Sequence, residues 1–288
     1  MNCKLSIINY ASLVKISHTI FALPFALVGY FLALQQTTQN LSWQTLLCVV
    51  LCMFFARNAA MSFNRYADKK YDALNIRTAQ REIPRGIITP NNALFFCIAN
   101  AGCFVITTFF INATCFALSP VALIIVLGYS YTKRFTSLCH FVLGLGLSVA
   151  PIGAYLAVTA QWALPPLLFS LLVLLWTAGF DIIYALPDEA FDKEQRLRSI
   201  PAAIGIRRAL WLSALVHTLC AALVIFIGLY LHANIFYFTG ASLFIACLTY
   251  QHCIVSPRKL KRVNLAFATL NGIASIVFCL FFVLSVYL

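Results

Sequence analysis

Charged residues are scarce in this sequence. Of its 288 residues only 10% are Asp, Glu, Lys or Arg, whereas 62% are hydrophobic, and the mean hydropathy is +0.90. Soluble globular domains carry about 25% charged residues, so this composition excludes an ordinary water-soluble domain. The sequence therefore predicts an integral membrane protein.

Several motifs are also absent. There is no Walker A sequence and no GxGxxG segment, so nothing favours nucleotide binding. The eleven cysteines show no CxxC spacing and the five histidines no paired spacing, which argues against a disulfide framework and against a zinc site. We interpret the cysteines as small apolar residues and the histidines as hydrogen-bonded residues near the membrane surface.

Long uncharged stretches recur along the whole chain. Crossing a bilayer takes about 20 mostly apolar residues. The sequence predicts nine transmembrane helices, at about 17–36, 43–62, 92–112, 115–132, 139–159, 163–186, 208–231, 234–252 and 264–287. We therefore expect an all-α, polytopic membrane protein whose residues 1–288 form a single domain. The first stretch lacks a small-residue cleavage site, so we expect it to be retained as a helix.

The formal net charge of +12 has an uneven distribution. Lys and Arg precede the first apolar stretch and then fill every second connection, after the second, fourth, sixth and eighth stretches. By the positive-inside rule, the N-terminus lies in the cytoplasm and the C-terminus outside. Binding to nucleic acid needs a basic face on a soluble fold, so we expect membrane lipids and no nucleic acid among the partners.

Only eight acidic residues occur, and seven of them lie in two short segments. The first segment places Asn64, Asp68 and Asp72 four residues apart, which puts their side chains on one face of a helix. Two carboxylates on adjacent turns repel each other unless a cation lies between them. The spacing therefore predicts a row of oxygen ligands for a divalent cation.

The second segment places Asp181, Tyr184, Asp188 and Asp192 on one helical stripe, and Pro187 predicts a bend near the membrane surface. Asp181 follows a long apolar run, so we expect it one or two turns inside the hydrocarbon. An ionised acid at the centre of a transmembrane helix costs about 2.5–3.5 kcal/mol on insertion scales. Asp181 is therefore a candidate functional residue.

Both acidic segments adjoin connections predicted to face the cytoplasm. Mg²⁺ is typically held by one or two carboxylates together with phosphate oxygens of a substrate, which two facing carboxylate rows suit. A diphosphate also needs cationic contacts. For these we select basic residues beside the acids: Arg65, Arg81, Arg85 and Lys133.

A diphosphate held at the membrane surface suggests a particular chemistry. Metal ions and cationic side chains neutralise the departing diphosphate, which lowers the barrier to ionising an allylic C–O bond. A dry pocket with aromatic rings then protects the allylic cation until an electron-rich ring attacks it. A membrane transporter is the alternative, because carriers also combine intramembrane acids with broken helices. Against it, both acidic segments lie at the same membrane face.

These motifs resemble the UbiA superfamily of intramembrane aromatic prenyltransferases over nearly the whole chain. The first family signature, NxxxDxxxD, is similar to Asn64, Asp68 and Asp72, and it is followed by family-like NxRT and RxxPxxG elements within NIRTAQREIPRG. The second signature, DxxxD, is similar to Asp188 and Asp192. The segments KISHTIFALPFALVGYF, YSYTKRF and GFDIIYAL also resemble corresponding family stretches.

The resemblance implies nine helices around a central cavity, with Mg²⁺ held by the two signatures and diphosphate contacts from Arg81 and Lys133. It places Asp181 and Tyr184 on the acceptor side, with Asp181 orienting or deprotonating a phenol. The GFDIIYAL stretch looks most like enzymes that transfer a polyprenyl group from polyprenyl diphosphate to 4-hydroxybenzoate in quinone synthesis. Relatives acting on naphthoate-type acceptors in the futalosine route to menaquinone are the alternative. The location implied is the bacterial inner membrane, with the active site facing the cytoplasm.

Overall fold

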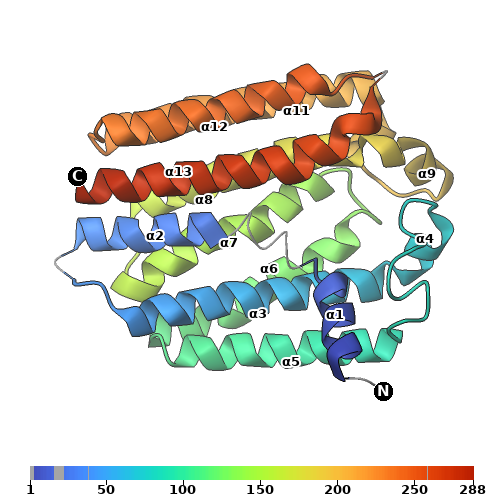
Figure 1. Ribbon diagram of the computed structural model, residues 1–288, viewed down its shortest axis with the longest axis horizontal. Helices are drawn as coiled ribbons and strands as arrows, with labels where there is room; N and C mark the ends of the chain where they lie inside the picture. Colours follow the sequence, from blue (N-terminus) through green and yellow to red (C-terminus); the bar gives the residue numbers. More distant parts are fainter. Residues whose placement is uncertain (1–2, 16–22, 38, 258) are drawn as a thin grey trace.

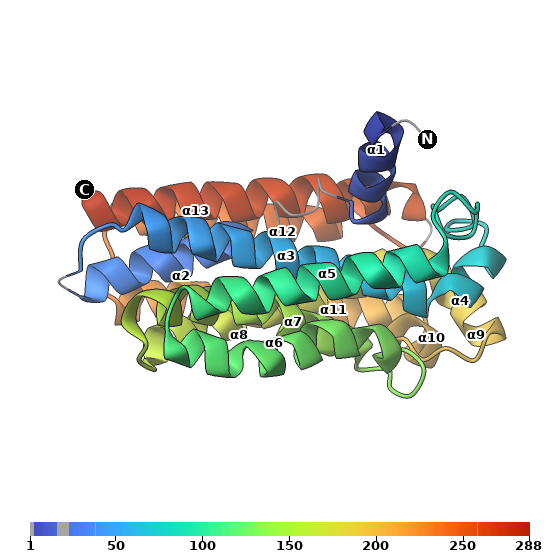
Figure 2. The same cartoon turned by 90° about the horizontal axis from the view of Figure 1, so that it is seen from below.

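The computed structural model describes residues 3–15, 23–37, 39–257 and 259–288, and in these residues the chain is all-helical. An isolated bridge between Ser256 and Lys259 is the one β-type pairing in this part of the chain. The long helices run side by side in a single bundle (Figures 1 and 2). Their bounds are α2 Leu23–Gln36, α3 Trp43–Ala67, α5 Pro90–Phe109, α6 Ala113–Thr132, α7 Cys139–Thr159, α8 Leu164–Ala185, α11 Ile206–Tyr230, α12 Ile235–Ile254 and α13 Asn271–Tyr287.

The observed helices coincide closely with the predicted spans. Within the described ranges, seven helical segments are long and apolar enough to cross a membrane. They are α3, α5, α6, α7, α8 with its continuation to Glu194, α11, and α13 with the π-helix η4, Leu265–Leu270, that precedes it. The part of α2 that is described has 14 residues, and the start of the predicted span 17–36 lies outside the described residues. A total of nine membrane-spanning helices therefore stays a prediction.

The core of the bundle is aromatic. Phe25 of α2, Trp176 of α8, Phe244 of α12 and Phe278 of α13 are fully buried against one another, with ring centroids 5.1–6.3 Å apart. Small residues let neighbouring helices approach closely, as is common between membrane helices. A Cβ atom on Gly144 of α7, for example, would lie 2.5 Å from the backbone oxygen of Leu174 in α8.

Short helices gather at one end of the bundle. They are α4 Lys69–Leu74, the 3₁₀ turn η2 Leu186–Asp188, α9 Glu189–Glu194 and α10 Ile200–Ile204. Figures 1 and 2 place α4 and α9 at this end, whereas the C-terminus lies at the opposite end. The two predicted acidic segments thus fall at the same end of the bundle.

The N-terminal helix α1, Cys3–Leu13, was not predicted from the sequence, and it lies crosswise to the bundle axis (Figure 1). Its end packs on the connection between α4 and α5, where Leu13 joins Ile83, Ile88 and Ala93 in a small apolar cluster. This contact holds the connection that carries several basic residues against the rest of the protein.

Candidate functional site

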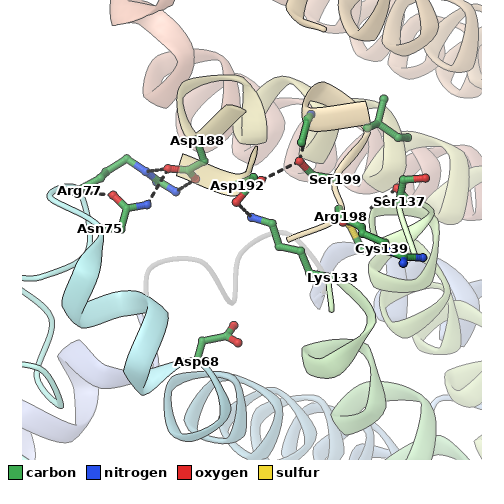
Figure 3. Close-up of polar contacts among 12 residues, drawn as sticks. Asp68, Asn75, Arg77, Lys133, Ser137, Cys139, Asp188, Asp192, Arg198 and Ser199 are labelled. Atoms are coloured by element: carbon green, nitrogen blue, oxygen red, sulfur yellow. Dashed lines mark hydrogen bonds and ion pairs between the residues drawn. The ribbon is translucent and has the colours of Figure 1, made fainter. Parts of the chain in front are cut away.

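A cavity of about 310 Å³ opens at the end of the bundle where the short helices gather. Both acidic segments line it, and Figure 3 shows Asp68 on the opposite side of the site from Asp188 and Asp192. The structure brings ten of the eleven residues selected from the sequence to this one cavity, namely Asn64, Arg65, Asp68, Asp72, Arg81, Lys133, Asp181, Tyr184, Asp188 and Asp192. Arg85 is the exception, because it is exposed and does not line the cavity.

The first acidic segment is not one continuous helix, as its regular spacing suggested. Helix α3 ends at Ala67, Asp68 is the residue between helices, and α4 begins at Lys69. The Asn64 amide donates to Asp68 Oδ2 at 3.0 Å, and Arg134 lies 3.4 Å from Oδ1. Burial, together with the nearby Asp72 carboxylate, raises the pKa of Asp68.

Asp72 is buried and has two unlike carboxylate oxygens. Its Oδ1 is 2.6 Å from a terminal nitrogen of Arg81. Its Oδ2 has no hydrogen-bond partner within the described residues. A buried oxygen atom without a partner is costly, and it is suited to receive a cation.

The second acidic segment bends at Pro187, as the sequence predicted. Helix α8 ends at Ala185, and the 3₁₀ turn Leu186–Asp188 leads into α9. The bend leaves Asp188 and Asp192 lining the cavity with side-chain exposures of 9% and 0%. Asp192 pairs with Lys133 at 2.7 Å and accepts a 2.7 Å hydrogen bond from the Ser199 hydroxyl (Figure 3). Burial favours neutral Lys133, but the Asp192 carboxylate outweighs it and raises the pKa of the lysine.

Asn75 and Arg77 join the two acidic segments, a role that sequence reasoning missed. Arg77 forms an ion pair with Asp188 through two nitrogens, and the Asn75 amide donates to the same carboxylate at 3.0 Å. Arg77 also donates to the Tyr184 hydroxyl at 2.9 Å. Burial alone lowers the pKa of Arg77, but the bonds to Asp188 raise it above its ordinary value. The NxRT element was the available signal for this contact.

Asp181 has a partner that the sequence did not reveal. His140, in the first turn of α7, is 2% exposed, and its Nδ1 lies 2.7 Å from Asp181 Oδ2. His140 is hydrogen-bonded, as the sequence predicts, and it also forms part of the cavity wall. No pairwise spacing connects it with Asp181 because the two residues lie on different helices, 41 positions apart.

A second, apolar cavity of about 330 Å³ lies between α3, α5, α6 and α7. Five residues line both cavities: Arg57, Met61, Tyr129, Leu143 and Leu147. The guanidinium of Arg57 forms no ion pair with the described carboxylates, and its buried Nε has no hydrogen-bond partner among the described residues. An unpaired cation therefore lies where the polar and apolar spaces meet.

The oxygen atoms in the polar cavity fit Mg²⁺. Five carboxylates line it, those of Asp68, Asp72, Asp181, Asp188 and Asp192, together with Asn64. Asp72 Oδ2 is buried and has neither a hydrogen bond nor an ion pair among the described residues. Within the described part of the chain, no three acidic, His or Cys side chains lie close enough to hold a metal ion by themselves. Mg²⁺ does not need such a group when phosphate oxygens of a substrate complete its coordination.

Comparison with known proteins identifies the family of the chain. The model of the UbiA prenyltransferase family matches residues 22–284. A 4-hydroxybenzoate octaprenyltransferase of Aliivibrio fischeri (strain MJ11) is 29% identical over 236 residues, 82% of each chain, and the same enzyme of Aliivibrio fischeri (strain ATCC 700601 / ES114) is 30% identical over 238 residues. The chain therefore belongs to the UbiA prenyltransferase family. It is a prenyl-transferring enzyme and an integral membrane protein, so the transporter alternative is wrong.

Solved structures share this fold. The apo structure of a UbiA homolog from Aeropyrum pernix K1 has a TM-score of 0.84 and 29% identity, covering 93% of this chain and 97% of that one. A UbiA homolog from Archaeoglobus fulgidus, bound to GPP and Mg²⁺, has a TM-score of 0.73 and 22% identity, covering 97% of this chain and 100% of that one. The second likeness shows the fold alone.

Proposed function

We propose that the protein transfers a polyprenyl group from polyprenyl diphosphate to 4-hydroxybenzoate in a Mg²⁺-dependent reaction of quinone synthesis. The observation that carries this proposal is the junction of the two cavities. A polar cavity lined with acids and bases adjoins an apolar one through five shared residues. A polyprenyl diphosphate has the same two parts, a charged head and an apolar chain.

The diphosphate binds in the polar cavity. Asn64, Asp68, Asp72, Asp188 and Asp192 hold Mg²⁺, which supplies charge neutralisation for the departing diphosphate. Arg65, Arg81 and Lys133 contact the diphosphate oxygens. Two observations support the role of Arg65. Its side chain is buried, and its Nε has no hydrogen-bond partner in the described part of the chain. Arg85 is left out of this set because it lies outside the cavity wall.

The prenyl chain extends into the apolar cavity, whose walls exclude water from the allylic carbon. Tyr129 lies at the junction, where the C–O bond of the diphosphate breaks. An aromatic ring face there attracts the positive charge of the allylic group. The protein also has to keep water away from the allylic cation until the acceptor ring attacks it, and the apolar walls of this cavity provide that dry space.

The acceptor binds beside Asp181 and Tyr184. A small aromatic acid carries a carboxylate, and Arg57 offers a cation with no protein carboxylate paired to it in the described ranges. The opposite end of the acceptor is a phenol, which needs a hydrogen-bond acceptor, and Asp181 is available in the same cavity. The curated relatives named as 4-hydroxybenzoate enzymes favour this acceptor over a naphthoate.

We further propose the placement expected from the sequence: nine membrane-spanning helices in one domain comprising residues 1–288, in a bacterial inner membrane. The N-terminus and the active site face the cytoplasm. In support, both acidic segments lie at the same end of the bundle, which is the end where the Lys- and Arg-rich connections lie.

The test is product formation in membranes that contain the expressed protein. Polyprenyl diphosphate of defined length and Mg²⁺ are supplied with either radiolabelled 4-hydroxybenzoate or a hydroxynaphthoate, and the extracted lipid is identified by mass spectrometry. We expect a prenylated 4-hydroxybenzoate that disappears when EDTA is added. A product from the naphthoate alone would move the enzyme to menaquinone synthesis, and product unaffected by EDTA would contradict the metal assignment.

A further inference from the structure

His140 is a buried titratable residue that the proposed reaction has not yet used. It lies in the first turn of α7, where its Nδ1 is 2.7 Å from Asp181 Oδ2. Its other ring nitrogen, Nε2, lies 3.3 Å from the backbone nitrogen of Ile200, at the start of α10. Both nitrogens of the imidazole therefore have a partner, one on each side of the ring.

The partners determine which nitrogen of His140 carries the proton. A backbone N–H can only donate, so the N–H of Ile200 requires a lone pair on Nε2. The neutral ring then carries its proton on Nδ1 and donates it to Asp181 Oδ2. A hydrogen bond of this type fixes both the tautomer and the orientation of a histidine ring.

The Asp181 carboxylate is thereby held in one orientation. Within the described residues His140 is its hydrogen-bond partner, and only Oδ2 is engaged. The side chain is 19% exposed and lines the polar cavity with Tyr184. Oδ1 is thus the carboxylate oxygen left for a ligand in the cavity.

We propose that His140 is a positioning residue that fixes Asp181 so that Oδ1 accepts the phenolic proton of the acceptor; this rests on the proposed function. As the ring carbon bonds to the allylic carbon and the C–O bond to diphosphate breaks, the phenolic proton passes to Asp181. The prenylated ring carbon then gives its own proton to the released diphosphate. Loss of that proton restores the aromatic ring as a phenolate. The phenolate oxygen then regains its proton from Asp181, which restores the carboxylate.

The segment that carries Ile200, whose backbone N–H bonds to His140, is held in place by further contacts in the site. Ile200 follows Ser199, whose hydroxyl binds the buried Asp192. The neighbouring Arg198 donates from its backbone nitrogen to the Lys133 carbonyl oxygen at 2.6 Å and from its side chain to the Phe135 carbonyl oxygen at 2.8 Å. The backbone donor that selects the His140 tautomer therefore cannot shift without disturbing several other contacts.

A double-mutant cycle tests the role of His140 with geranyl diphosphate and 4-hydroxybenzoate as substrates. His140→Leu removes the donor, and we expect kcat to fall by about 10–100-fold, the usual effect of losing an orienting partner, with KM for geranyl diphosphate unchanged. His140→Asn places an amide donor near the position of Nδ1 and should recover most of the activity. In the Asp181→Asn background, His140→Leu should have less than about a twofold further effect, because the two residues act as one unit.

Either of two results would overturn the positioning role. One is an equal loss from His140→Leu in the wild-type and Asp181→Asn backgrounds. The other is a loss that appears in KM for geranyl diphosphate rather than in kcat. His232→Asn serves as the matched control, because His232 is exposed in the connection between α11 and α12 and lines neither cavity; its kinetics should equal those of the wild type.

A spectroscopic measurement tests the geometry without relying on activity. In ¹⁵N-histidine-labelled protein in nanodiscs, the signals lost in His140→Asn identify His140. We expect an unprotonated Nε2 and a protonated Nδ1, both shifted by Asp181→Asn. A protonated Nε2 in the neutral ring would overturn the proposal. A wild-type protein that shows the expected tautomer but prenylates no aromatic acceptor would instead overturn the proposed function.

Discussion

The two acidic segments differ in how the protein neutralises them. In the first, the Asp68 side chain is 29% exposed, and Asp72 keeps one buried oxygen without a hydrogen bond in the described part of the chain. In the second, Asp188 and Asp192 are 9% and 0% exposed, and each is bonded by a cation and by a neutral donor. Each of the four carboxylates lies near a protein cation, but the first segment keeps a more exposed carboxylate and, at Asp72 Oδ2, a buried oxygen with neither a hydrogen bond nor an ion pair in the described ranges.

The origin of the compensating cations also differs. Asp72 pairs with Arg81, nine residues further along the same connection. Asp188 pairs with Arg77, which is 111 residues away in sequence. The second segment is therefore held by contacts that cross the cavity. When a diphosphate with metal ions enters, these cations have an alternative anionic partner, and the carboxylates have an alternative cationic one.

Removing one acid from each segment should have the largest effect. Asp72→Asn and Asp188→Asn each replace a negative oxygen by an amide, and we expect transfer of prenyl groups to 4-hydroxybenzoate to fall by about 10²–10³-fold or more, since each removes an electrostatic contribution to the reaction. Activity in membranes is the measurement, with protein quantity checked by immunoblot.

The control for both variants is Glu194→Gln. Glu194 belongs to the second segment, but it is exposed and does not line the cavity. Its activity should match the wild type. Full activity in Asp72→Asn or Asp188→Asn would contradict the assignment of the metal-binding residues.

Breaking the contact across the cavity should have the next largest effect. Arg77→Gln removes the ion pair with Asp188 and the bond to the Tyr184 hydroxyl. We expect kcat/KM for the prenyl diphosphate to fall by about 10–100-fold, the range found when a residue that orients a ligand is lost. Arg85→Gln is the control and should stay within about twofold of the wild type. Equal losses in the two variants would instead favour the original selection of Arg85 from the sequence.

The contrast between Arg77 and Arg85 illustrates what the sequence reveals. The composition of the two acidic segments and the bend at Pro187 could be predicted from the sequence, but the break at Asp68 could not, because the regular four-residue spacing suggested one continuous helix. Apolar stretches of sufficient length likewise located the long helices to within a few residues. Both predictions depend on local physics, namely helix periodicity and the burial of apolar side chains in lipid.

Contacts between elements could not be read in the same way. Arg77 and Arg85 have the same charge and lie in the same connection, but the path of that connection places one against Asp188 and the other in solvent. His140 reaches Asp181 because α7 packs closely on α8. Such pairings depend on helix packing and on the shape of irregular connections, for which a single sequence carries no periodic signal.

Each carboxylate that we propose as a metal ligand is paired with a protein cation, and this pairing predicts cooperative binding of metal and diphosphate. Mn²⁺ alone must compete with Arg77, Arg81, Lys133 and Arg134 for the carboxylates, whereas inorganic pyrophosphate offers these cations a new partner. We expect pyrophosphate to tighten Mn²⁺ binding by about tenfold or more, an energetic coupling of at least about 1.4 kcal/mol. Electron paramagnetic resonance of free Mn²⁺ with detergent-purified protein measures it. Equal affinities with and without pyrophosphate would contradict the exchange of partners.

The smallest effect should come from a neutral donor of the second segment. Ser199→Ala removes the 2.7 Å hydrogen bond to Asp192, whose side chain is fully buried, while Lys133 still compensates its charge. Loss of a hydrogen bond to a charged buried group costs about 1.5–3 kcal/mol, so thermal unfolding of the purified protein should shift measurably while prenyl transfer falls by less than about tenfold. Ser285→Ala, which removes a bond within the last helix turn far from the site, is the matched control. A loss of transfer in Ser199→Ala as severe as that in Asp188→Asn would contradict this ranking. It would mean that Lys133 alone does not hold Asp192 in place, so that neutral donors are as important as ion pairs for the shape of the cavity.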